Sequence, residues 1–194
     1  MNNCWYRLNI NNSFAIRQEF NNLERLKEYF KTVDPISVHL LDNQEDLKIL
    51  FTEEWLEYMK SINLEVSQCL MFYRIPGAHH PFAHIDLPRY RKHLGLAINW
   101  CLDESDGEMV WYKPTEDAGI TQHNFNAQYT LWPEENLVEI DRCAIGTSPV
   151  AVRTDIPHNV FIGNKPRWSF SFRVTHKTES WDEDFQLIKS VLLE

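Results

Sequence analysis

The sequence predicts a mainly β protein with flanking helices, in which the β part is a double-stranded β-helix, or jelly roll. Three observations predict this class. Short runs rich in β-branched and aromatic residues follow one another from about residue 65, separated by turn-like segments such as IPGAHH, DESDG and GNKP. Two stretches before residue 65 carry apolar residues at helical spacing, and the end of the chain has the pattern of another helix. Many short strands with helices outside them favour an antiparallel jelly roll.

The length of the chain favours one domain. It has 194 residues, of which 43% are hydrophobic, and this is enough to bury a sizeable core. Within a single domain over 1–194 we expect α/β support over 1–64, the jelly-roll core over 65–176 and a C-terminal helix over 177–194.

The region before residue 65 is expected to alternate between strands and helices. CWYRLNI and ISVHLL are typical of short strands. The helix expected over SFAIRQEFNNLERLKEYFK begins at Ser13, a favourable N-cap residue. The second predicted helix covers DNQEDLKILFTEEWLEYMKSI, and its buried side is formed by Leu47, Leu50, Phe51, Trp55 and Tyr58.

The β-rich part supplies the strands of the predicted jelly roll. Each run ends at a turn-like segment. The expected strands are EVSQCLMFYRI, PFAHID, YRKHLGLAINWCL, GEMVWYKP, AQYTLWP, NLVEI, PVAVRT, HNVFI and RWSFSFRVT. The last helix is expected over SWDEDFQLIKSVLLE, whose first turn is acidic.

Charge and cysteine content exclude several classes of function. The net charge of −9 argues against a nucleic-acid partner, which needs many Lys and Arg side chains on phosphates, and against an anionic membrane surface. Four cysteines without a CxxC pair fit neither a zinc ribbon nor a disulfide-dense secreted scaffold. The N-terminus lacks the pattern of a signal peptide, and no apolar run has the length of a membrane span. We therefore expect a cytoplasmic protein.

Two of the expected strands have a polar or small side that is typical of a pocket wall. In RWSFSFRV, alternation puts Arg167, Ser169, Ser171 and Arg173 on one face and the aromatic residues on the other. Two arginines on such a face fit a bound anion, since a guanidinium binds a carboxylate through two hydrogen bonds. In YRKHLGLAINW, the corresponding face carries Arg91, His93, Gly95, Ala97 and Asn99.

Three further residues have the chemistry of a metal site. His84 and Asp86 lie two residues apart in PFAHID and so point to the same side of a strand, while His158 directly follows a proline in DIPHNVFIG. Two imidazoles and one carboxylate bind one face of a non-haem Fe(II) and leave positions open for other ligands. The alternative is that the HxD pair is a chance pattern of surface residues.

Four motifs follow one another along the chain: Tyr73-x-x-Pro76-Gly77, His84-x-Asp86, His158 and Arg167-x-Ser169. In this order they resemble the motifs of the Fe(II)/2-oxoglutarate-dependent oxygenases. The resemblance implies that His84, Asp86 and His158 hold Fe(II). It also implies that 2-oxoglutarate binds as cosubstrate, with O2 as the oxidant. Residues implied to contact 2-oxoglutarate are Arg167, which lies nine residues after His158, together with Ser169, Arg173 and Tyr73.

Two subfamilies are locally similar. RWSFSFR resembles a segment of the DNA-alkylation-repair oxygenases in which both arginines contact the cosubstrate, whereas the acidic chain does not suit a nucleic-acid substrate. RYRKHLGLAINW resembles a segment of the aspartyl/asparaginyl β-hydroxylases, which would add Arg91 and His93 to the pocket. Those enzymes generally lack the carboxylate ligand, whereas this sequence has Asp86.

The resemblance implies a hydroxylase that acts on an amino-acid side chain or a small metabolite and releases succinate and CO2. The substrate would be a small molecule or a peptide. The alternatives are a non-catalytic jelly-roll binding protein that retains a metal or anion pocket, and a cupin-type metal enzyme. Cupins cluster their ligands as HxH with a nearby Glu, a pattern that does not occur in this sequence. Segment 114–147 is the expected source of loops that contact the substrate.

Overall fold

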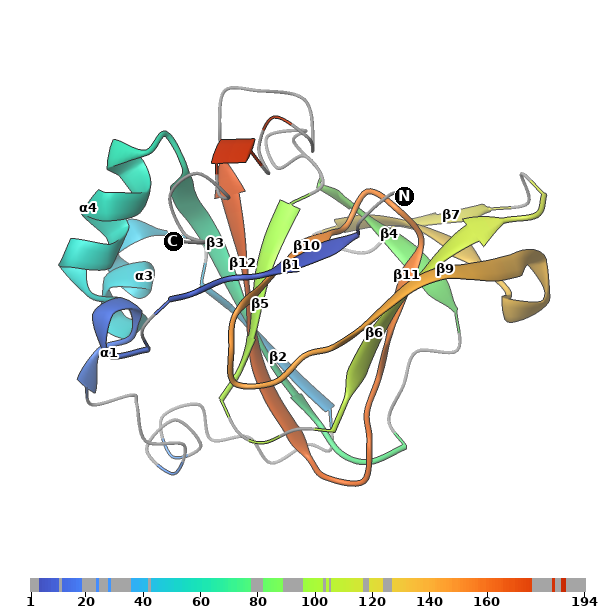
Figure 1. Ribbon diagram of the computed structural model, residues 1–194, viewed down its shortest axis with the longest axis horizontal. Coiled ribbons are helices and arrows are strands. Elements are labelled where there is room, and N and C mark those ends of the chain that lie inside the picture. The colour runs from blue at the N-terminus through green and yellow to red at the C-terminus, as the bar shows by residue number, and fades with distance from the viewer. Residues whose placement is uncertain are drawn as a thin grey trace.

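The computed structural model describes residues 4–10, 12–18, 24, 28, 36–41, 43–77, 82–88, 96–102, 104, 106–116, 119–123, 127–175, 183 and 186–187. In this part of the chain, twelve strands form two six-stranded sheets, and every pair of neighbouring strands is antiparallel (Figure 1). In spatial order, the first sheet contains β1 (Trp5–Arg7), β10 (Val150–Arg153), β5 (Leu96–Cys101), β12 (Arg167–Thr175), β3 (Glu65–Arg74) and β2 (Ile36–Leu41). The second contains β7 (Ile120–His123), β8 (Ala127–Trp132), β4 (Ala83–Pro88), β11 (His158–Phe161), β6 (Glu108–Pro114) and β9 (Leu137–Ala144).

The connection of the strands identifies the fold. From β3 to β6, and again from β9 to β12, successive strands alternate between the two sheets. The strand order β10-β5-β12-β3 in one sheet therefore corresponds, strand by strand, to the order β9-β6-β11-β4 in the other. This is the winding of a double-stranded β-helix, so the predicted fold class is confirmed. β7 and β8 extend the second sheet on the side away from the helices (Figure 1).

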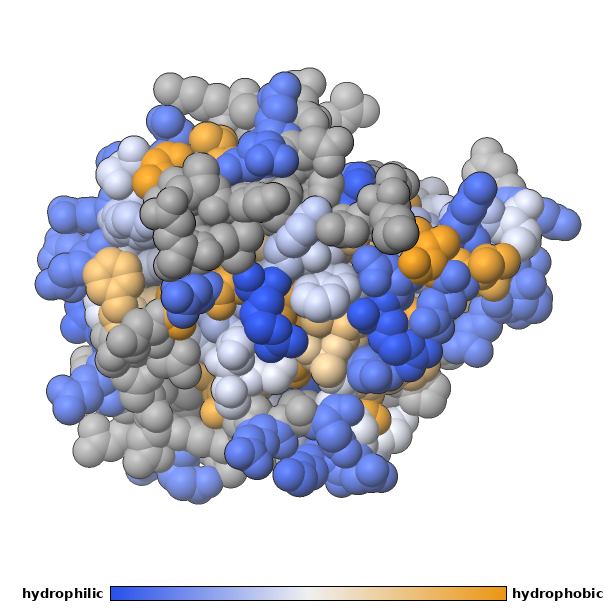
Figure 2. Space-filling view, in the orientation of Figure 1, coloured by the Kyte–Doolittle hydropathy of each residue, from blue (hydrophilic) through white to orange (hydrophobic). Residues whose placement is uncertain are grey.

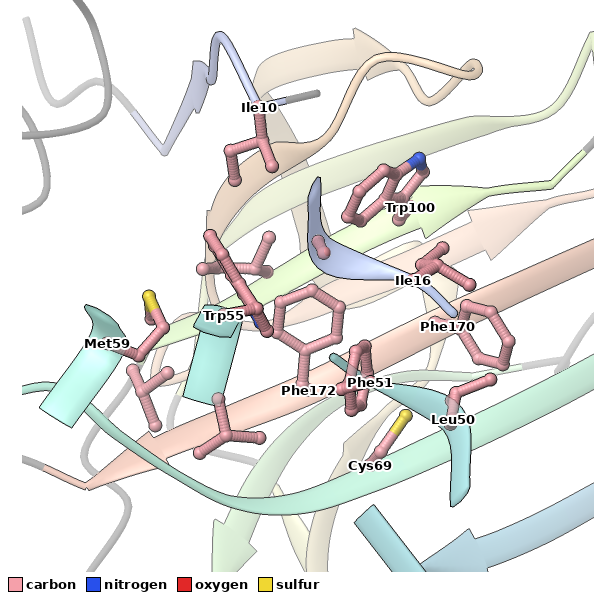
Figure 3. Close-up of a cluster of buried hydrophobic side chains, with 14 of the residues drawn as sticks. Ile10, Ile16, Leu50, Phe51, Trp55, Met59, Cys69, Trp100, Phe170 and Phe172 are labelled. Carbon is pink, nitrogen blue, oxygen red and sulfur yellow. The ribbon is translucent and has the colours of Figure 1, made fainter. Parts of the chain in front are cut away.

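Helices cover the outer face of the first sheet. They are α1 (Asn12–Ala15), α3 (Gln44–Leu50) and α4 (Glu53–Ser61), and a short 3-10 helix, η2 (Glu134–Asn136), precedes β9. Beneath them Phe172 lies with its ring centroid 5.2 Å from that of Phe51 and 6.4 Å from that of Trp55 (Figure 3). Trp168, Phe170 and Phe172 all belong to this outer core. The apolar face of β12 is therefore buried by the helices, and its polar face points the other way.

The helix predictions before residue 65 need two corrections. The first predicted helix ends at Ala15, because Ile16 pairs with Phe51 in an isolated β-bridge. Of its residues after Ile16, Arg17 has no regular structure, Gln18 is in a 3-10 turn, Glu24 and Glu28 are helical, and the others lie outside the described residues. The second predicted helix is two helices, since Phe51 and Thr52 are extended where this bridge forms. Tertiary pairing thus outweighs helical periodicity at both places.

The other predicted elements agree with the described residues. The strands expected in CWYRLNI and ISVHLL are present as β1 and β2. β7 was not expected, because the run that forms it has no clear alternation. Of the predicted C-terminal helix, Glu183, Gln186 and Leu187 are helical, and its other residues lie outside the described residues.

Thr52→Ala is expected to lower the free energy of unfolding by about 1–2 kcal/mol. The Thr52 hydroxyl accepts a hydrogen bond from the Trp55 amide at 3.1 Å, which caps α4, and donates one to the carbonyl of Phe14. Thr52→Ser keeps this hydroxyl and serves as the matched control. Urea unfolding of both variants measures the difference, and equal losses in the two would show that the cap contributes nothing.

The surface is largely hydrophilic on the face that Figure 2 shows, with hydrophobic side chains in small groups.

A second core lies between the two sheets and joins Ala97, Cys101 and Val152 of the first sheet to Met109 and Trp111 of the second. None of the helices in the described residues is both long and apolar enough to span a membrane.

Candidate metal centre and anion pocket

The candidate metal ligands meet on two neighbouring strands. β11 pairs with β4 so that His158 lies directly opposite His84, and Asp86 follows two residues later on the same face. The Nε2 atom of His84 lies 3.5 Å from Oδ1 of Asp86, and Nε2 of His158 lies 3.9 Å from Oδ2. One ligand atom from each of the three residues lies within 4.8 Å of the others, a spacing that suits a shared metal ion.

His158 is held in the orientation that a ligand needs. Its side chain is buried, and its Nδ1 lies 2.9 Å from the carbonyl oxygen of Ile156. Because a carbonyl only accepts, Nδ1 carries the hydrogen, and Nε2 keeps a lone pair on the side of Asp86. Burial lowers the pKa of His158, so the imidazole is neutral at neutral pH.

Asp86 is also held by an arginine. The Arg173 guanidinium on β12 donates to Oδ2 of Asp86, and this ion pair links the two sheets. Burial alone would raise the pKa of Asp86, but the charge of Arg173 outweighs it, and so do those of His158 and His84 once acid protonates them, so the pKa is lowered to about 2. The carboxyl is therefore ionised, as a metal ligand must be.

Acidification is expected to destabilise the metal-free protein through Asp86. Its pKa is about 2 in the folded protein, whereas an aspartate in an unfolded chain has a pKa of about 3.9. Between these values the unfolded chain binds the proton first, so stability present above about pH 4 is lost as the pH falls toward 2, by roughly 2 kcal/mol in all. Arg173→Met should remove this dependence, because burial then acts on Asp86 without the opposing guanidinium. Urea midpoints against pH measure it, and parallel profiles for both proteins would contradict it.

The polar face of β12 points between the sheets, as expected. Arg173 reaches Asp86 on the opposite sheet, and the residues in phase with it, Arg167, Ser169 and Ser171, are all buried. On β5, Asn99 lies opposite Ser171, donates to the sulfur of Met109 at 3.6 Å and is 8% exposed. The structure therefore brings the candidate ligands, Arg173 and Asn99 into the same inter-sheet space.

Arg167 is a buried cation that lacks an anionic partner among the described residues. The side chain is 3% exposed, and within the described part of the chain its Nε and Nη1 have no hydrogen-bond acceptor. A buried charge without a partner costs several kcal/mol. These two donor nitrogens are therefore suited to the carboxylate of a bound molecule.

Tyr73 needs a correction, since the structure does not bring it to the pocket. Its ring lies 4.6 Å from that of Trp168, on the helix-covered face of the first sheet and opposite to Arg167 and Ser169. Arg91 and His93 lie outside the described residues, so their predicted place in the pocket stays a prediction.

Arg74, which the sequence patterns did not single out, lies on the same inter-sheet face as Arg167. It pairs with Arg167 across β3 and β12, so both side chains leave the sheet on the same face. It is half-buried over the ring of Phe72, and its Nη1 donates to the carbonyl of Tyr73 at 3.0 Å. The sequence could have shown that Arg74 points to the same face of its strand as Phe72, because the two residues are two positions apart. It could not have shown the strand register that sets Arg74 beside Arg167.

No protein-family model matches this sequence, and no curated protein matches it. The structure is similar to several solved structures. A prolyl hydroxylase from Trichoplax adhaerens, in complex with a hypoxia-inducible-factor peptide fragment, has 13% identity and a TM-score of 0.47, covering 91% of this chain and 84% of its own. A prolyl-4-hydroxylase from Pseudomonas putida has 12% identity and a TM-score of 0.49, covering 90% and 92%. Vicilin from hazelnut, Corylus avellana, has 8% identity and a TM-score of 0.38, covering 74% and 30%.

Proposed function

We propose that this protein is an Fe(II)- and 2-oxoglutarate-dependent oxygenase that hydroxylates an amino-acid side chain or a small metabolite. One observation carries the proposal. Arg167 is a buried arginine whose Nε and Nη1 have no acceptor among the described residues, and it lies on the inter-sheet face of β12. Near the other end of the same strand, Arg173 contacts the carboxylate of a two-histidine, one-carboxylate set. A carboxylate-bearing ligand beside a metal ion satisfies both features at once.

The donor set fits iron. Imidazole and carboxylate donors together are typical of non-haem Fe(II), and three protein donors on one side leave room for a chelating cosubstrate and O2. His84, Asp86 and His158 would hold the ion, with the His158 ring fixed by the Ile156 carbonyl. When bound, Fe(II) supplies the one-electron chemistry that activates O2.

The two arginines of β12 are assigned different roles. They are six residues apart, or roughly 20 Å along the strand, so they act at the two ends of the pocket. Arg167 would pair with the far carboxylate of 2-oxoglutarate, with Ser169 beside it on the same buried face. Arg173 would keep Asp86 ionised and oriented toward the metal.

The proposed reaction consumes one 2-oxoglutarate and one O2 for each substrate. One oxygen atom enters the new hydroxyl group of the substrate, and the other enters succinate as 2-oxoglutarate loses CO2. The chain's own contribution is to bind and orient these molecules and to exclude water. The burial of Ser169, Ser171 and Asn99 supports such an enclosed pocket.

Turnover of 2-oxoglutarate tests the function. Purified protein with Fe(II), O2 and 2-oxoglutarate, screened against amino acids and peptides, should release succinate and CO2 in equal amounts, with none released under argon or with EDTA. Arg7 is an exposed arginine on β1, so Arg7→Met should turn over normally and serves as the control for substitutions of the buried arginines. Metal binding without any turnover across the screen would instead favour the non-catalytic binding protein, and turnover with a metal but without 2-oxoglutarate would favour a cupin-type enzyme.

A further inference from the structure

At the Arg167 end of β12, the inter-sheet face of the first sheet carries two arginines rather than one. Arg74 and Arg167 are directly opposed residues of an antiparallel pair, where Cβ atoms lie about 5 Å apart. Like charges opposed in this way repel, and the repulsion grows as the groups leave water. Arg167 is 3% exposed and Arg74 is half-buried, so solvent screens the pair only in part.

We propose that Arg74 and Arg167 together form a two-arginine clamp for the terminal carboxylate of the cosubstrate, which makes Arg74 a second determinant of dicarboxylate selectivity. This rests on the proposed function, because it assigns a residue to the same pocket. Two guanidinium groups side by side are stabilised by one anion placed between them, which removes their repulsion and satisfies the free N–H groups of Arg167.

The surroundings of Arg74 support this role. Its guanidinium lies 5.3 Å from the centroid of the Phe72 ring, which keeps the side chain over the pocket face of β3. Burial, and then the charge of Arg167, lower the pKa of Arg74, as expected where two cations share one site. Neither feature is explained by a role in the outer core, which lies on the other face of the sheet.

Two ligands that differ only at the far end test the clamp. 2-Oxopentanoate has the 2-oxo acid group of 2-oxoglutarate but carries a methyl group in place of the terminal carboxylate. Anaerobic titrations with Fe(II) give the dissociation constants of both ligands for the wild type, Arg74→Met, Arg74→Lys and the control Arg7→Met. We expect Arg74→Met to weaken 2-oxoglutarate binding about tenfold while 2-oxopentanoate binding stays unchanged. Arg74→Lys should recover part of the loss, because it keeps the charge without the planar fork.

The outcomes distinguish a failure of the clamp from a failure of the proposed function on which it rests. If the wild type prefers 2-oxoglutarate and Arg74→Met keeps the full preference, the clamp is wrong and the proposed function stands. Equal weakening of both ligands would also overturn the clamp, since Arg74 would then act on the fold or the metal. If the wild type binds neither ligand in the presence of Fe(II), the proposed function itself fails.

Thermal stability without cosubstrate gives a second, independent readout. Removing one of two opposed cations should raise the melting temperature of Arg74→Met by about 2 °C, whereas Arg7→Met should leave it unchanged. Added 2-oxoglutarate should then stabilise Arg74→Met less than the wild type. A lower melting temperature for Arg74→Met would mean that Arg74 is a structural residue, and the clamp would be rejected.

Discussion

Arg167→Met is expected to weaken 2-oxoglutarate binding by about a hundredfold or more while leaving Fe(II) binding intact. The guanidinium is buried, and its Nε and Nη1 have no acceptor among the described residues. Truncating one partner of a buried charge pair costs about 2–5 kcal/mol, much of it from the carboxylate that is left without a partner. Methionine keeps most of the side-chain volume, so the packing around it should change little.

Anaerobic calorimetric titration of 2-oxoglutarate into the Fe(II)-loaded proteins measures this effect. The same variant should be more stable than the wild type when no cosubstrate is present, because it no longer buries a charge that has no anionic partner among the described residues. This opposite sign distinguishes a ligand-binding arginine from one that stabilises the fold. Wild-type affinity for 2-oxoglutarate in Arg167→Met would remove the basis of the cosubstrate assignment.

Asp86→Ala is expected to abolish Fe(II) binding and also to destabilise the fold. The variant loses the carboxylate donor, and metal affinity should fall by more than about a hundredfold, since even outer residues of metal sites contribute factors of 10–100. It also leaves the Arg173 guanidinium, whose side chain is 12% exposed, without its partner. Breaking a buried pair in this way costs about 3–5 kcal/mol.

A double variant separates the two consequences of Asp86→Ala. Asp86→Ala combined with Arg173→Met removes both charges, so most of the lost stability should return while Fe(II) binding stays absent. Urea unfolding and metal analysis after anaerobic loading measure the two properties on the same samples. If Fe(II) bound to the double variant as to the wild type, Asp86 would not be a ligand.

The sequence was informative wherever one residue's place follows from its neighbours in the chain. Alternation in RWSFSFRV predicted a buried polar face on β12, and the structure buries Arg167, Ser169 and Ser171 there. The HxD spacing likewise puts His84 and Asp86 on one side of β4. Both are properties of a single extended strand, in which every second side chain points the same way.

Features that depend on pairing between distant segments could not be predicted. The register of β3 against β12 sets Arg74 opposite Arg167 and turns Tyr73 to the outer face, next to Trp168. Likewise, the bridge between Ile16 and Phe51 divides the predicted second helix. A one-residue change of register reverses which face each side chain takes, and this information lies in the tertiary packing.

Anaerobic titration of the metal-free protein with Fe(II) and then with 2-oxoglutarate tests the central claim most directly. A 2-oxo acid chelated to Fe(II) gives a weak visible charge-transfer band, so the band reports both ligands at one site. We expect the band to form in the wild type, to be lost in His158→Ala, and in Arg167→Met to require far more 2-oxoglutarate. A folded wild-type protein that binds Fe(II) but gives no band at saturating 2-oxoglutarate would contradict the oxygenase assignment.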